Sequence, residues 1–352
     1  MPRLRRACAR GMAARRLVSG LLVAASSLEA RVSPADGAFS PVIGVLAEPL
    51  GEDTPGSYLE AWYVKWVEAQ GARVVPLRYD APAAEVEALL ARVNGLLFPG
   101  GGVAISEEAP YGSFSSNIFT RALQERMPVW GTCLGFEQLM LYSSGEPAPG
   151  PLTSGWASEK IMLPLNLTQQ GKVSPLLADW PEDLKRATAR ENVTWHFHEA
   201  GVSTSDFEKS ETLSKFWHVL ATNVDLRGQE FVSVVEGKDG LPFFGTQFHP
   251  EKNANEFEES SEASLPGGDS VHSAAAVEMA ARMAQHFVGR ARGFLKFGFT
   301  REEFWKWSIA NWPMQLAGQL KQFAALPPHM QVYYFPPVTV ADKVPSESKL
   351  LV

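Results

Sequence analysis

From Pro41 onward, short apolar runs alternate with segments of helical periodicity, and this alternation limits the possible folds more than any other feature. Residues 42–47 (Val-Ile-Gly-Val-Leu-Ala) are apolar throughout, which predicts a strand buried on both faces. The same patterns predict further strands at 72–77, 95–98 and 128–131, and helices at 57–70, 83–93 and 116–126. Strands separated by helices of about ten to fifteen residues form βαβ units. We therefore expect an α/β fold in which a parallel sheet carries helices on both faces.

The second half of the chain is less regular but continues the same domain. Strands are predicted near 160–165, 194–198, 218–223, 231–236 and 241–248, followed by an acidic loop at 254–270 and a helix at 271–292. No internal repeat and no second complete α/β pattern is present. We expect one domain over 41–292, with residues 293–352 forming an extension that packs on the domain or is partly disordered.

The first thirty residues differ from the rest. They contain six arginines, then an apolar stretch from Leu17 to Leu28, then small residues around Ala30. This order predicts a secretory signal peptide over 1–30, although an organellar transit peptide is the rival interpretation. Two glycosylation tripeptides, at Asn166 and Asn192, favour the secretory pathway and thus a vacuole, a lysosome or the extracellular space.

Net charge and cysteine content limit the partners that this chain can bind and the states that its cysteines can adopt. Removing residues 1–30, with their six Arg and one Glu, changes the formal net charge from −7 to −12. A chain this acidic is poorly suited to nucleic acids or anionic membranes, so neither is an expected partner. Cys8 lies in the predicted signal, which leaves Cys133 without a disulfide partner and therefore either inert or reactive.

The residues around Cys133 favour a reactive thiol. Cys133 lies in a G-x-C-x-G pattern (Gly131 to Gly135) between a buried strand and the helix that runs to Tyr142. Such a turn projects its central side chain above the sheet, and its glycines avoid clashes. The positive end of the helix dipole favours the thiolate, and the Leu134 N–H is directed where an oxyanion would form. The alternative is a small apolar residue at a strand end.

Two further segments should reach the same edge of the sheet, because parallel strands end together. Gly100, Gly101 and Gly102 follow the strand at 95–98, and their N–H groups could complete an oxyanion hole. His249 ends the strand at 241–248 as a candidate base, and Glu251 could orient its imidazole. Taken singly, these segments are also explained by a plain turn and a surface histidine.

Together, FPGG (98–101), WGTCLGFEQL (130–139) and GTQFHPEK (245–252) resemble the class I glutamine amidotransferase-like superfamily, and within it the γ-glutamyl hydrolases. The resemblance covers about 41–292 and implies a flavodoxin-like sheet with a mixed edge. It assigns Cys133 as nucleophile, His249 as base and Glu251 as third member of the triad. It also matches His198 to a second functional histidine, expected to bind substrate.

His196 and His198 also form an H-x-H pair on one face of a predicted strand, which raises the question of a zinc site. No cysteine or acidic cluster accompanies them, so we predict no metal. The resemblance implies no cofactor.

The implied reaction is cysteine-dependent hydrolysis of γ-glutamyl amide bonds, with folate poly-γ-glutamates as substrate. Alternatives are a hydrolase of glutathione conjugates or other small γ-glutamyl peptides, a glutaminase that supplies ammonia to a synthase, and a catalytically silent binding protein. The sequence leaves open endo or exo cleavage, the final compartment, a homodimer, and the Arg or Lys residues that bind substrate carboxylates.

Overall fold

The computed structural model describes residues 40–51, 54–255, 272–296, 298–324 and 326–337. The predicted signal at 1–30, most of the acidic loop and the last fifteen residues lie outside the described residues. Within the described ranges, no helix is both long and apolar enough to cross a membrane.

Five parallel strands form the centre of the main sheet and confirm the predicted fold class. In spatial order they are β3 (Arg73–Arg78), β1 (Val42–Pro49), β4 (Gly95–Phe98), β5 (Val129–Thr132) and β11 (Phe243–Thr246). Three antiparallel strands extend it beyond β11: β10 (Glu230–Gly237), β9 (Trp217–Val224) and β7 (Asn166–Leu167). The mixed edge is therefore also confirmed.

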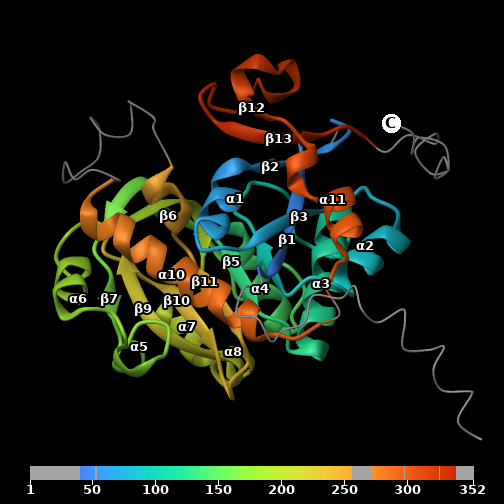
Figure 1. The fold of residues 1–352 in the computed structure, drawn as a ribbon. Coiled ribbons are helices and arrows are strands. Elements are labelled where there is room, and N and C mark those ends of the chain that lie inside the picture. Colours follow the sequence, from blue (N-terminus) through green and yellow to red (C-terminus); the bar gives the residue numbers. More distant parts are fainter. Residues whose placement is uncertain (1–39, 52–53, 256–271, 297, 325, 338–352) are drawn as a thin grey trace, which may run out of the picture.

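Helices cover both faces of this sheet (Figure 1). On one face lie α1 (Ala61–Glu68) and α10 (Ala274–Gly293), and on the other α2 (Ala83–Leu90), α3 (Pro110–Glu125) and α4 (Leu134–Ser144). Neighbouring strand residues divide between the two cores: Leu97 packs with the first layer, and Leu96 and Phe98 with the second. This alternation explains why these strands are apolar on both faces.

The remaining helices are short and lie between or after the later strands. They are α5 (Gln169–Val173), α6 (Glu182–Thr188), α7 (Thr204–Lys209), α8 (Glu211–Phe216) and α11 (Arg301–Trp307), with 3-10 turns at Pro250–Ala254, Ile309–Asn311, Ala317–Gln319 and Lys321–Phe323. The turn at Pro250–Ala254 directly follows His249.

A separate two-stranded sheet pairs β6 (Thr153–Leu163) with β8 (Thr194–Gly201). The sequence patterns placed strands in both regions but did not indicate that they pair outside the main sheet. Its register shifts between Glu159 and Ile161, which inserts Lys160 as an extra residue in β6.

Several predicted elements begin elsewhere: the helix expected over 116–126 begins at Pro110, and the strand expected near 160–165 begins at Thr153. The helix expected over 57–70 begins at Ala61, because residues 57–60 form strand β2 (Ser57–Glu60). β2 pairs with the end of β1 and with β13 (Gln331–Phe335), which in turn pairs with β12 (Met314–Leu316). Figure 1 shows these three strands at one end of the molecule, beside α1. Local periodicity could not show the pairing with β13, because this partner comes some 270 residues later in the chain.

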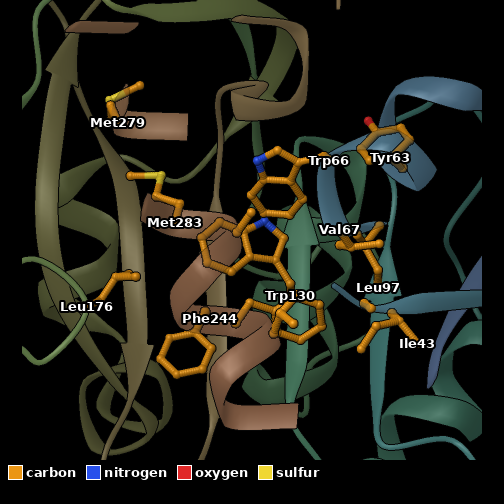
Figure 2. Packing of buried hydrophobic residues seen from close by; sticks show 14 of the residues in the cluster. Ile43, Tyr63, Trp66, Val67, Leu97, Trp130, Leu176, Phe244, Met279 and Met283 are labelled. Carbon is orange, nitrogen blue, oxygen red and sulfur yellow. The ribbon is translucent and has the colours of Figure 1, made fainter. Parts of the chain in front are cut away.

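Trp130 is the centre of the core between the sheet and α10 (Figure 2). Its ring lies 5.1 Å from that of Trp66, 6.2 Å from Phe244 and 6.1 Å from Phe287. Its Nε1 donates a hydrogen bond to Thr132 Oγ1 over 3.1 Å, so the one polar group of the side chain is satisfied.

We expect Trp130→Ala to lower the free energy of unfolding by about 3–5 kcal/mol, because the cavity cannot be refilled by aromatic neighbours held on three elements. Urea unfolding measures this. The matched control is Trp305→Ala on α11, where the side chain is 53% exposed and the change should stay below about 1 kcal/mol. Equal losses in the two variants would contradict this description of the core.

Candidate active site

Cys133 lies at the turn between β5 and α4 in a backbone conformation that side-chain-bearing residues rarely adopt. Its φ is 51° and its ψ is −108°. Its N–H donates to the Thr246 carbonyl over 2.9 Å, which ties the turn to the end of β11. The strained backbone and this anchor hold the side chain at the carboxyl edge of the sheet.

The two glycines around Cys133 are needed for space, as the pattern predicted. A Cβ on Gly131 would lie 2.7 Å from the carbonyl oxygen of Gly135. A Cβ on Gly135 would overlap the carbonyl of Phe98, the last residue of β4. The turn therefore packs backbone against backbone, and α4 approaches β4 closely.

His249 follows β11 at the same edge, and its Nδ1 lies 2.7 Å from Glu251 Oε1. Both side chains are buried. The His249 N–H donates to the Trp195 carbonyl over 2.9 Å, which fixes the backbone against β8. With Nδ1–H directed at a carboxylate, Nε2 is the nitrogen left to accept a proton.

Gly100 lies between Cys133 and His249. A Cβ added to Gly100 would be 2.7 Å from His249 Cε1 and 3.1 Å from Cys133 Cβ, so the two side chains approach the same point. The Gly100 N–H donates to the Tyr63 hydroxyl over 2.8 Å, and this hydroxyl lies 3.4 Å from His249 Nδ1. The structure thus brings together Cys133 and the His249–Glu251 pair, with Tyr63 beside them.

The predicted oxyanion donors differ in their surroundings. The Leu134 N–H interacts with the Cys133 sulfur and acts to lower the pKa of the thiol. Gly101 is exposed and lies against the buried carboxyl of Glu48, which would have to shift to admit a Cβ there. Gly102 is also exposed, and a Cβ there would meet nothing within 4 Å.

The helix terminus favours the thiolate as expected, through the Leu134 N–H, but other effects on the Cys133 thiol outweigh it. Burial raises the pKa of the Cys133 thiol well above its ordinary value, and the carboxylates of Glu137 and Glu251 raise it further. The Leu134 N–H and the Lys252 charge only partly offset this. The thiol is protonated at rest and donates to the Phe197 carbonyl, with 3.7 Å between Sγ and oxygen.

His198 is buried beside this carbonyl, and both of its ring nitrogens are engaged. Nδ1 lies 2.8 Å from the Ala200 carbonyl, so it carries the proton, and Nε2 lies 3.2 Å from His196 Nδ1. His196 Nε2 in turn lies 2.9 Å from Thr194 Oγ1. Burial lowers the pKa of His198 to about 4 and holds the pKa of His196 well below its ordinary value, so the pair is neutral near pH 7.

The H-x-H pair thus forms a hydrogen-bonded chain within the β6–β8 region. In the described part of the chain, no group of three or more His, Cys, Asp or Glu residues is arranged to hold a metal ion.

Sequence reasoning missed Tyr63 and Glu137. Tyr63 lies within the helix expected over 57–70, and nothing in that pattern indicates where its hydroxyl lies. Glu137 follows Cys133 by four residues, so one helical turn brings it back beside the thiol. Its Oε1 accepts a hydrogen bond from Gln247 Nε2 over 3.0 Å. The i+4 spacing was the available signal.

One family model and several curated relatives match most of this chain, and they agree on the family. A family model described as Glutamine amidotransferase class-I matches residues 55–262. The gamma-glutamyl hydrolase of Mus musculus is 38% identical over 264 residues, covering 73% of this chain and 79% of the mouse protein. That of Homo sapiens is 36% identical over 281 residues, covering 77% and 84%. Gamma-glutamyl hydrolase 1 of Arabidopsis thaliana is 32% identical over 267 residues, covering 72% of each chain.

Burial raises the pKa of Glu137 from 4.5 to about 8, partly opposed by the Gln247 hydrogen bond. A carboxyl whose pKa is higher in the folded state stabilises the fold below pH 4.5, and this contribution is lost as the pH rises through 8. Glu137→Gln keeps the shape of the side chain and accepts the same hydrogen bond. We expect its free energy of unfolding to rise by a few kcal/mol relative to that of the parent chain as the pH increases from 5 to 8.5.

Urea unfolding at the two pH values measures this difference. Glu208→Gln, at an exposed position on α7, is the control and should show no pH-dependent difference. A Glu137→Gln variant that tracks the parent chain at both pH values would show that Glu137 is not held neutral by its surroundings.

Proposed function

The chain belongs to the gamma-glutamyl hydrolases, within the class I glutamine amidotransferase family, and we propose that it trims folate poly-γ-glutamates through a thioester on Cys133. It is a cysteine-type hydrolase of γ-glutamyl bonds in small molecules. The observation that carries the proposal is the convergence of Cys133 and the His249–Glu251 pair on Gly100.

In the first half of the proposed reaction, His249 Nε2 takes the thiol proton as Sγ attacks the γ-amide carbonyl. A bond forms between Sγ and the carbonyl carbon, and the oxygen becomes an oxyanion. His249 then gives its proton to the amide nitrogen as the carbon–nitrogen bond breaks, so the leaving glutamate departs as an amine. The γ-glutamyl group remains on Cys133 as a thioester.

In the second half, His249 removes a proton from water as the water oxygen attacks the thioester carbonyl. The carbon–sulfur bond breaks, the sulfur regains the proton from His249, and the product leaves as a γ-carboxylic acid. Glu251 holds the imidazole in one tautomer and stabilises its charged form in both halves. The raised pKa of the thiol fits this scheme, because proton transfer then accompanies attack.

The oxyanion is assigned to two backbone donors: the N–H of Leu134 and that of Gly101 or Gly102. Leu134 N–H is already beside the sulfur, and the two glycines are exposed at the edge of the site. Gly100 is a less suitable donor because its N–H is engaged by Tyr63. We further propose that His198 contacts substrate once one of its two hydrogen bonds is exchanged.

We expect Cys133→Ala to remain folded and to lose at least about 10³-fold in the rate of pteroyl-penta-γ-glutamate hydrolysis. The assay resolves product lengths at acidic and neutral pH, and their pattern distinguishes endo from exo cleavage. Parent enzyme treated with iodoacetamide is a further control and should also lose activity, because Cys133 is the one cysteine outside residues 1–30.

Retained hydrolysis in folded Cys133→Ala would remove the nucleophile assignment. Another result would leave the nucleophile assignment intact and overturn only the identity of the substrate. If the parent chain left pteroyl-penta-γ-glutamate intact but released glutamate from glutathione conjugates, or ammonia from glutamine, the thiol chemistry would stand and the folate assignment would fall.

The secretory location is also a proposal, supported by the pattern of residues 1–30 and by the two glycosylation tripeptides. Asn166 is exposed on β7, and Asn192 is half-buried. Expressed in a eukaryotic secretory host, the chain should lose about thirty residues and carry N-glycan that an endoglycosidase removes. Full-length, unglycosylated protein in the cytosol would overturn this.

A further inference from the structure

The proposed substrate is a polyanion, whereas the buried surroundings of Cys133 are lined mainly by acids and offer it few cations. A poly-γ-glutamate has an α-carboxylate on every unit, and the described groups around the site include Glu48, Glu137 and Glu251, all buried. Burial and the nearby Glu60 carboxyl raise the pKa of Glu48, as expected for acids crowded in a dry region. A polyanionic chain that extends from this site needs a cation outside the buried shell.

Lys252 is not this cation, because its charge lies inside the site and acts on Cys133. Its side chain is buried, with Nζ 4.6 Å from the centre of the Trp62 ring. Its charge acts on Cys133, whose thiol pKa it lowers. A group in this position stabilises charge at the reacting sulfur rather than on distant units of a substrate chain.

Lys160 is exposed and lies one strand away from the nucleophile. In the β6–β8 sheet, Glu159 pairs with Phe197 and Ile161 pairs with His196, so Lys160 is the extra residue of a bulge. Its φ of 51° is unusual for a residue other than glycine. Bulges redirect a side chain, and here Nζ lies 5.8 Å from the centre of the Phe197 ring.

Phe197 connects this cation to the reacting thiol. Its carbonyl oxygen accepts a hydrogen bond from Cys133 Sγ over 3.7 Å. Its side chain is 45% exposed, whereas most large apolar side chains of the described chain are buried. The adjacent Trp195 carbonyl accepts from the His249 N–H, so β8 borders both members of the catalytic pair. A substrate chain that left the site along β8 would pass the Phe197 ring before it reached Lys160.

The Lys160 ammonium is available for an anion. Within the part of the chain that the structure describes, it forms no ion pair, and the neighbouring Glu159 carboxylate is not bonded to it. The aromatic ring restricts the long side chain without neutralising it, which lowers the entropic cost of binding a carboxylate.

We propose that Lys160, presented by the β6 bulge over the Phe197 ring, binds an α-carboxylate of a glutamyl unit adjoining the cleaved one. This inference rests on the proposed function, because it assumes a substrate of several γ-linked glutamates. Lys160 is a substrate-binding residue in this scheme and has no part in bond making or breaking.

The test compares Lys160→Glu with the parent enzyme on two substrates. Pteroyl-penta-γ-glutamate has neighbouring α-carboxylates, whereas γ-glutamyl-p-nitroanilide has only the cleaved unit. We expect Lys160→Glu to raise KM for the pentaglutamate about three- to ten-fold, with kcat within about two-fold and the anilide unaffected. Lys160→Arg should restore the parent KM, and added salt at about 0.5 M should shrink the difference.

Lys172→Glu, at an exposed position on α5, is the control for a change in net charge and should behave as the parent on both substrates. An unchanged KM for the pentaglutamate in Lys160→Glu, or an equal rise with the anilide, would overturn the inference while leaving the proposed function intact. A parent enzyme that cleaves the anilide but not the pentaglutamate would instead overturn the folate function, and the inference with it.

Discussion

The structure of the site depends on the close approach of backbone to backbone where β4, β5 and α4 meet. Gly135 packs on the Phe98 carbonyl, and Gly131 packs on Gly135, so α4 begins almost in contact with the sheet. The same contact fixes the end of β4, from which the glycine run at 100–102 continues. Nucleophile and candidate oxyanion loop are therefore positioned by one junction that has no room for side chains. The strained φ of Cys133 is tolerated because the surrounding packing leaves the turn no alternative.

The electrostatics of the site favour a neutral resting state. The thiol, Glu48 and Glu137 all have raised pKa values because they are buried. His196 and His198 are neutral for the same reason, since burial disfavours their charged forms. In such surroundings, charge that develops during attack interacts strongly with the few dipoles and ions aimed at it, which are the Leu134 N–H, the His249–Glu251 pair and Lys252. In the proposed mechanism, the site therefore relies on proton transfer at the moment of reaction rather than on charge held at rest.

Sequence patterns predicted the central sheet well, because each parallel strand is apolar on both faces and ends in a recognisable turn. They also predicted that Cys133, the glycine run and His249 share one edge, since this follows from parallel topology. They failed where a position is set by a distant partner. The Tyr63 hydroxyl meets His249 because α1 packs against the turn at Pro250–Ala254, and residues 57–60 form a strand because they pair with β1 on one side and with β13 on the other. The pairing of His196 with His198 was visible as a spacing, but its hydrogen bonds required the pairing of β6 and β8.

The pairing of β13 with β2 has a consequence for how the chain matures. β2 leads directly into α1 (Figure 1), where Trp62 packs in one cluster with Phe323, Met330 and Val332. During synthesis, residues 57–60 leave the ribosome long before residues 331–335, and at ordinary elongation rates the delay is on the order of tens of seconds. Over that interval the helix that carries Tyr63 lacks its outer support. The nascent chain can therefore hold an assembled central sheet while one wall of the site is still incomplete.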